Sequence, residues 1–84
     1  MTIQKISRLI AYLNTRYIVI TNEIEERKQW VKNLERLQYD EQLSRDRYEE
    51  ISGEIDELSD EVSDLAEESA FLKETVEVLQ SWEI

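Results

Sequence analysis

Apolar residues recur at alternating intervals of three and four along two long stretches of the chain, residues 3–34 and 48–79. Eighteen of the twenty repeat positions are apolar, and only Arg27 and Ser69 interrupt the pattern. A repeat of this kind keeps one seam of a helix facing a partner helix. The pattern therefore predicts two coiled-coil helices. Their seam positions are Ile3, Ile6, Ile10, Leu13, Tyr17, Ile20, Ile24, Arg27, Val31 and Leu34, then Tyr48, Ile51, Ile55, Leu58, Val62, Leu65, Ser69, Leu72, Val76 and Leu79.

The two repeats are out of phase with each other, since continuing the first one would place Gln38 and Glu41 in the seam. Asp40 and Ser44 between them are favourable helix N-cap residues. Basic residues precede this gap and acidic residues follow it, which suits a helix end followed by a helix start. We expect one domain, residues 1–84, with helices at about 2–38 and 45–82 and a turn at 39–44.

The expected fold class is all-α, an antiparallel helical hairpin of the coiled-coil type. Folding the chain at residue 41 pairs positions whose numbers sum to 82, so Ile6 meets Val76 and Leu34 meets Tyr48. Charge favours the same pairing: residues 1–45 hold eight basic and six acidic side chains (+2), residues 46–84 two and fourteen (−12), giving the total of −10. One long helix is the alternative, because residues 37–47 contain no strong helix breaker.

Several large apolar residues lie outside the seam at heptad positions g and c. In an antiparallel pair these positions open onto one side of both helices, here named the g/c face. Scattered exposed apolar residues are common, but two Trp and one Phe on one face indicate an interface. We expect a homodimer, most simply a four-helix bundle, with a different protein as the alternative partner. The predicted self-association residues are Leu9, Tyr12, Val19, Trp30, Phe71, Val78 and Trp82, and Leu37 shares their face.

Carboxylates dominate residues 49–68, where ten of twenty residues are acidic and none is basic. The apolar residues of this segment point to the seam, so its exposed surface is almost entirely carboxylate. Carboxylates one helical turn apart approach the phosphate spacing of a nucleic-acid strand (about 6–7 Å). The segment therefore predicts a surface that binds a basic protein, as an inhibitor or nucleic-acid mimic. A purely solubilising surface is the alternative. The predicted partner-binding residues are Asp56, Glu57, Asp60, Glu61, Asp64 and Glu67.

Catalytic chemistry is restricted because the chain contains no His and no Cys, which removes the usual nucleophile–base pairs and thiolate metal sites. Carboxylates remain: the chain contains the motifs Glu23-x-x-Glu26 and Glu57-x-x-Asp60. In the predicted pairing Glu23, Glu26, Glu57 and Glu61 gather on the g/c face and could hold Mg²⁺. These two short motifs resemble the ExxE and ExxD arrangement of all-α nucleotide pyrophosphohydrolases of the MazG type. The resemblance implies a Mg-dependent nucleotide hydrolase, which we keep as a remote alternative.

The expected function is that of a small non-enzymatic interaction protein without cofactor or metal. Its net charge of −10 disfavours direct binding to nucleic acid or to an anionic membrane. The longest apolar run, residues 17–20, is too short to span a membrane, and the N-terminus lacks a signal-peptide cleavage site. We therefore expect a cytoplasmic protein. The main alternative function is a structural coiled-coil module that assembles through its apolar patch.

Overall fold

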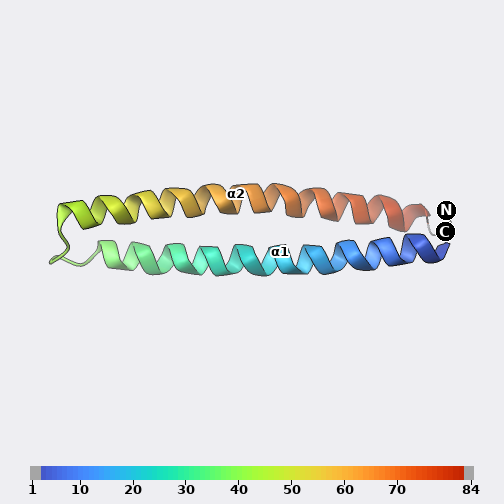
Figure 1. The fold of residues 1–84 in the computed structure, drawn as a ribbon, viewed down its shortest axis with the longest axis horizontal. Helices are drawn as coiled ribbons and strands as arrows, with labels where there is room; N and C mark the ends of the chain where they lie inside the picture. The colour runs from blue at the N-terminus through green and yellow to red at the C-terminus, as the bar shows by residue number, and fades with distance from the viewer. Residues whose placement is uncertain (1–2, 83–84) are drawn as a thin grey trace.

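Two long antiparallel helices form the whole of the described structure, a computed structural model that covers residues 3–82 (Figure 1). Helix α1 runs Ile3–Gln38 and helix α2 runs Arg45–Trp82. They lie side by side in a rod of 62 × 14 × 13 Å, with both chain ends at one end of the rod. The predicted all-α helical hairpin is confirmed. Its predicted start at Thr2 and the side chain of Ile3 lie outside the described residues.

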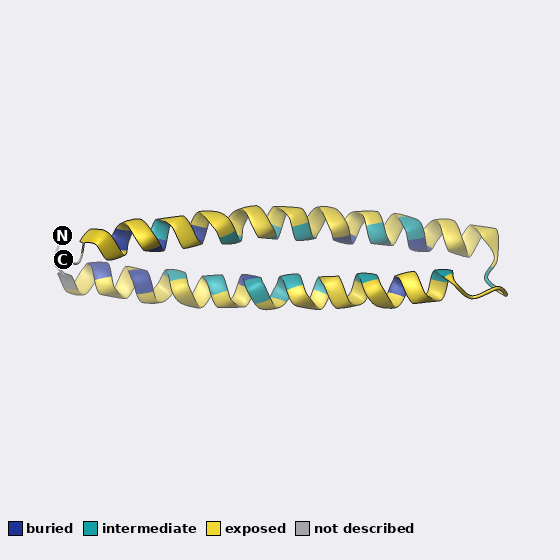
Figure 2. Cartoon of the chain, turned by 180° about the vertical axis from the view of Figure 1, so that it is seen from behind, coloured by how far each residue is buried: buried dark blue, intermediate teal, exposed yellow. Residues whose placement is uncertain are grey.

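The seam supplies nearly all of the buried surface (Figure 2). Every seam side chain described is buried or half-buried, with one exception, Tyr48. Two apolar clusters stand out within the seam. The cluster at the open end of the hairpin contains Ile6, Ile10, Val76 and Leu79, with Leu13 packed against it. The cluster near the connection contains Leu34, Ile51 and Leu58, with Val31, Leu43 and Ile55 packed against it.

The connection covers residues 39–44 and is held by local hydrogen bonds. The Ser44 hydroxyl accepts a hydrogen bond from the Arg47 backbone N–H at 3.2 Å, which is the N-cap interaction of α2. Asp40 acts differently: its Oδ1 accepts from the Gln42 N–H at 3.0 Å and closes a turn. Both residues are favourable N-caps in the sequence, and only the second begins a helix. Leu43 folds back onto the nearby apolar cluster.

The predicted pairing of Leu34 with Tyr48 is wrong. Leu34 shares a cluster with Ile51 and Leu58, while Tyr48 is 48% exposed. The amide Nε2 of Gln38 donates to Ser52 Oγ at 2.8 Å, a pair whose numbers sum to 90 instead of 82. The helices near the connection are thus offset by about one heptad from the predicted register.

The physical reason for this offset is that the connection is not symmetric. Two turn hydrogen bonds, from the Tyr39 N–H to the Arg36 carbonyl and from the Asp40 N–H to the Leu37 carbonyl, extend the end of α1. Leu43 then packs against the seam cluster of Leu34, Ile51 and Leu58. The first turn of α2 consequently lies beyond the end of α1, as Figure 1 shows. Tyr48 on that turn has no helix opposite it and stays exposed.

Candidate functional site

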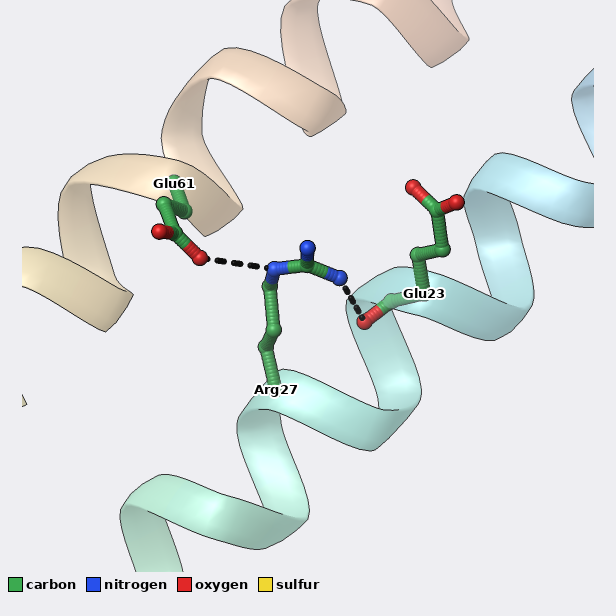
Figure 3. Close-up of polar contacts among 3 residues, drawn as sticks. All are labelled: Glu23, Arg27 and Glu61. Atoms are coloured by element: carbon green, nitrogen blue, oxygen red, sulfur yellow. Dashed lines mark hydrogen bonds and ion pairs between the residues drawn. The ribbon is translucent and has the colours of Figure 1, made fainter.

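Arg27, the charged exception in the seam of α1, reaches across to α2 (Figure 3). Its Nε lies 2.8 Å from Glu61 Oε2, and its Nη1 donates to the backbone carbonyl of Glu23 at 3.3 Å. The Arg27 side chain is 30% exposed and that of Glu61 54%. The arginine stem therefore covers the seam while its guanidinium meets a carboxylate at the edge. This cross-helix pair was not predicted, because sequence spacing alone does not tell where a long side chain leaves the seam.

The electrostatic setting of Arg27 raises the pKa of its guanidinium above the ordinary value. The hydrogen bond to Glu61 is the largest cause, partial burial opposes it, and the negative charges of Glu61, Glu23 and Glu26 add to it. A raised pKa of a cation means that its stabilising contribution is lost only when the pH rises past that value. Arg27 therefore stays charged at any pH at which the protein would be studied.

A second pair, between Arg16 and Glu68, also joins the two helices. Arg16 Nη2 lies 3.5 Å from Glu68 Oε1, and both side chains are nearly half exposed. Both residues are at heptad position g, and the g positions of an antiparallel pair face each other along one edge of the seam. The pair marks the g/c face near the middle of each helix, which makes it a useful reference for the residues on either side.

All six predicted partner-binding carboxylates are exposed. Of these, Glu61 alone takes part in an ion pair within residues 3–82. The remaining five make no side-chain hydrogen bond or ion pair to the described part of the chain. They are Asp56, Glu57, Asp60, Asp64 and Glu67. The structure thus brings six carboxylates together along the outer side of α2, five of them without a cation beside them.

A hollow of about 400 Å³ opens between the helices next to this carboxylate row. Trp30 of α1, which is 57% exposed, lines it from one side. Glu54, Glu57 and Glu61 of α2 line it together with Leu58 and Arg27. A ring with an exposed face among carboxylates forms a setting suited to a cationic side chain. Glu54 is a residue that sequence reasoning missed, although its g position, one heptad before Glu61, could have indicated it.

The predicted self-association residues are all exposed in the single chain, from 39% for Leu9 to 67% for Phe71. The structure divides them. Phe71, Val78 and Trp82 line one shallow groove on α2 near the open end. Trp30 lies apart from them, in the carboxylate-lined hollow nearer the connection. Apart from Trp30 and Leu37, the exposed apolar residues of the g/c face therefore lie in the half of the hairpin away from the connection.

A metal centre is not formed by the predicted carboxylate cluster. No group of three or more Asp, Glu, His or Cys among the described residues could hold a metal ion. The guanidinium of Arg27 instead bonds the Glu61 carboxylate and the backbone carbonyl of Glu23 (Figure 3).

Comparison with known proteins adds no relative: no protein family, no curated protein and no solved structure matches the chain. Neither helix, over the residues described, combines the length and the apolar character needed to cross a bilayer. The surfaces that can indicate a function are therefore the apolar and acidic halves of the g/c face and the outer side of α2.

Proposed function

We propose that this chain is a non-enzymatic interaction protein that binds a basic surface of another protein through the carboxylates of α2. The observation that carries the proposal is the row of unpaired carboxylates. Asp56, Glu57, Asp60, Asp64 and Glu67 are exposed and have no counter-charge in the described chain. Like charges one helical turn apart repel by a few tenths of a kcal/mol per pair, and a basic partner removes that repulsion.

The hollow beside Trp30 is the proposed centre of the interface with the basic partner. A lysine or arginine side chain entering it meets the indole ring on one side and the carboxylates of Glu54 and Glu57 on the other. Cation–π contacts of this kind contribute about 0.5–2 kcal/mol, more when water is excluded. The surrounding carboxylates attract the cation over a longer range and speed association. Trp30 is accordingly the proposed anchor and the carboxylate row the surrounding rim.

The class of partner follows from charge and spacing. Carboxylates at successive helical turns are about 5.4 Å apart, close to the separation of phosphates along a nucleic-acid strand (about 6–7 Å). A protein surface that binds a phosphate backbone therefore offers cations at matching intervals. We take a nucleic-acid-binding protein as the partner, with this chain occupying its binding site as an inhibitor.

A charge-reversal pull-down from an extract of the source organism tests the proposal. The test variant changes Asp60, Asp64 and Glu67 to Lys. The control changes Glu25, Glu35 and Glu77 to Lys, which are exposed on the other side of the seam, so both variants move the net charge from −10 to −4. Lys is a good helix former, so both variants should keep their helicity by circular dichroism.

The expected result is a basic protein that is retained by wild type and control but lost, by at least about tenfold, with the test variant. High salt and added nucleic acid should both release it. Equal retention by both triple variants would show that the row is only a solubilising surface. Retention that is indifferent to salt but sensitive to changes at Phe71 and Trp82 would instead favour the assembly-module alternative.

A further inference from the structure

The g/c face is divided into two halves of different chemistry. Toward the open end it carries the groove-forming residues Phe71, Val78 and Trp82 on α2, and Leu9 and Tyr12 on α1. The open-end cluster places Ile6 and Ile10 of α1 against Val76 and Leu79 of α2, so these apolar residues lie alongside one another. We name Leu9, Tyr12, Val19, Phe71, Val78 and Trp82 the open-end patch.

The ion pair between Arg16 and Glu68 joins a g position of α1 to a g position of α2, so it marks the edge of the seam that the g residues of both helices share. Leu9 precedes Arg16 by one heptad, and Trp82 follows Glu68 by two, so both lie on the edge that this pair crosses. Beyond the pair, toward the connection, the same edge carries Glu61 and Trp30. The face thus changes from apolar to acidic near the middle of the rod.

From this division we infer that a second copy of the chain covers the open-end patch, in an antiparallel arrangement in which only the open-end halves overlap. Three aromatic rings, each 61–67% exposed, present roughly 300–450 Å² of ring surface per chain. With Leu9, Val19 and Val78 the patch reaches roughly 600 Å², so two copies bury about 1,200 Å². The buried area is at the lower end of the range of a specific dimer, and the patch on one chain is at the upper end of the largest apolar patches of monomers, about 300–600 Å².

A two-fold dimer could be parallel, antiparallel with full overlap, or antiparallel with partial overlap, and the distribution of charge favours the last of these. A parallel dimer along the full length would bring the carboxylates Glu54, Glu57 and Glu61 against their own copies in the partner. A fully overlapped antiparallel dimer would cover the apolar patch of each chain with the acidic half of the other, which desolvates carboxylates. When only the open-end halves overlap, the apolar patch of one chain packs on that of the other. The carboxylates in the half near the connection then stay in water.

The expected dimer is consequently a four-helix bundle only at its centre. The patch is centred near residue 14, so the overlap is about 33 Å long at 1.5 Å per residue. Two rods of 62 Å that overlap by that amount give a particle of about 90 Å. One hairpin, with its carboxylate row and Trp30, projects from each end. Self-association therefore yields two identical acidic arms on one particle, and it does not depend on the function proposed for those arms.

Small-angle X-ray scattering together with sedimentation equilibrium tests this inference on the wild-type chain. A mass of twice 10.1 kDa and a maximum dimension of about 90 Å are expected. A dimer with a maximum dimension near the 62 Å of one hairpin would overturn the offset arrangement, and a monomer at high micromolar concentration would overturn self-association altogether.

Phe71→Glu is the matched test variant, because Phe71 is 67% exposed and its replacement leaves the seam untouched. Because both chains of a two-fold dimer carry the substitution, two rings are lost from the interface. Dimerisation should therefore weaken by at least about 100-fold while helicity is kept. Ile18→Lys is the control, since Ile18 is 59% exposed but lies outside the g/c face. Dimerisation lost equally in both variants, or in neither, would contradict the assignment of the open-end patch. Binding of the basic partner by a monomeric Phe71→Glu chain would leave the proposed function standing on its own.

Discussion

Replacing Arg27 with leucine should stabilise the hairpin. Arg27 occupies a seam position, with its side chain 30% exposed and its charge paired to a Glu61 that is itself 54% exposed. An ion pair this open to solvent contributes about 0.2–1 kcal/mol. A leucine buried in the seam contributes about 1.5–3 kcal/mol, of which the arginine stem already supplies roughly half. The apolar gain of about 1.1 kcal/mol, less about 0.6 kcal/mol for the lost ion pair, predicts a net gain of about 0.5 kcal/mol, so the melting temperature should rise by about 2–4 °C.

The assay is thermal and urea unfolding followed by circular dichroism at one fixed protein concentration. Two further variants make the interpretation unambiguous. Arg27→Ala removes the stem as well as the charge and should destabilise by about 1–2 kcal/mol. Arg16→Gln breaks the exposed pair with Glu68 without altering the seam and should change stability by less than about 0.5 kcal/mol.

A loss of 1 kcal/mol or more in Arg27→Leu would instead mean that the ion pair stabilises the hairpin more than apolar contact does at this position. The same variant has a functional consequence. Glu61 loses its internal partner, so the carboxylate row becomes more negative by one charge. Binding of a basic partner should therefore tighten in Arg27→Leu, and unchanged or weaker binding would argue against a role for Glu61.

Two other predictions concern the helices themselves. Gly53→Ala should stabilise by about 1 kcal/mol in urea unfolding, because Gly53 lies in α2 with an ordinary backbone and nothing within 4 Å of an added Cβ; no gain would mean that α2 is not a continuous helix there. Cysteines replacing Gln38 and Ser52 should cross-link within one chain much faster than cysteines replacing Leu34 and Tyr48, which the observed register separates by about one heptad, or 10 Å. Faster linking of the second pair would restore the symmetric register.

The hairpin could be predicted from the sequence because the apolar repeat carries most of the information. A 3.5-residue spacing sustained over residues 3–34 and 48–79 has few physical interpretations other than two seam-forming helices. The register could not be predicted, since any heptad shift places apolar seam positions opposite one another. The register depends on the connection, where Leu43 packs against the cluster that contains Ile51. A short polar segment gives little sign of how its single leucine packs.

The candidate surfaces could be predicted in outline only. Heptad positions indicate correctly that Trp30 and Phe71 are exposed, since helical geometry alone determines which side a residue faces. Whether two such residues form one patch depends on what lies between them along the rod. Trp30 lines the same hollow as Glu54 and Glu57 of the opposite helix, and the register of the two helices determines which residues meet there. The separation of the apolar and acidic halves therefore required the structure.

Chemical-shift mapping by NMR would locate the surface that binds the basic partner. Isotope-labelled protein would be titrated with the basic protein recovered in the pull-down, and the positions that respond would be identified. If the partner binds the carboxylate row and Trp30, the resonances of the Trp30 indole N–H and of the amides of residues 54–67 should shift. The amide resonances of Phe71 and Trp82 should not change. Shifts confined to Phe71 and Trp82, with no response from Trp30 or the carboxylate row, would contradict the proposed function.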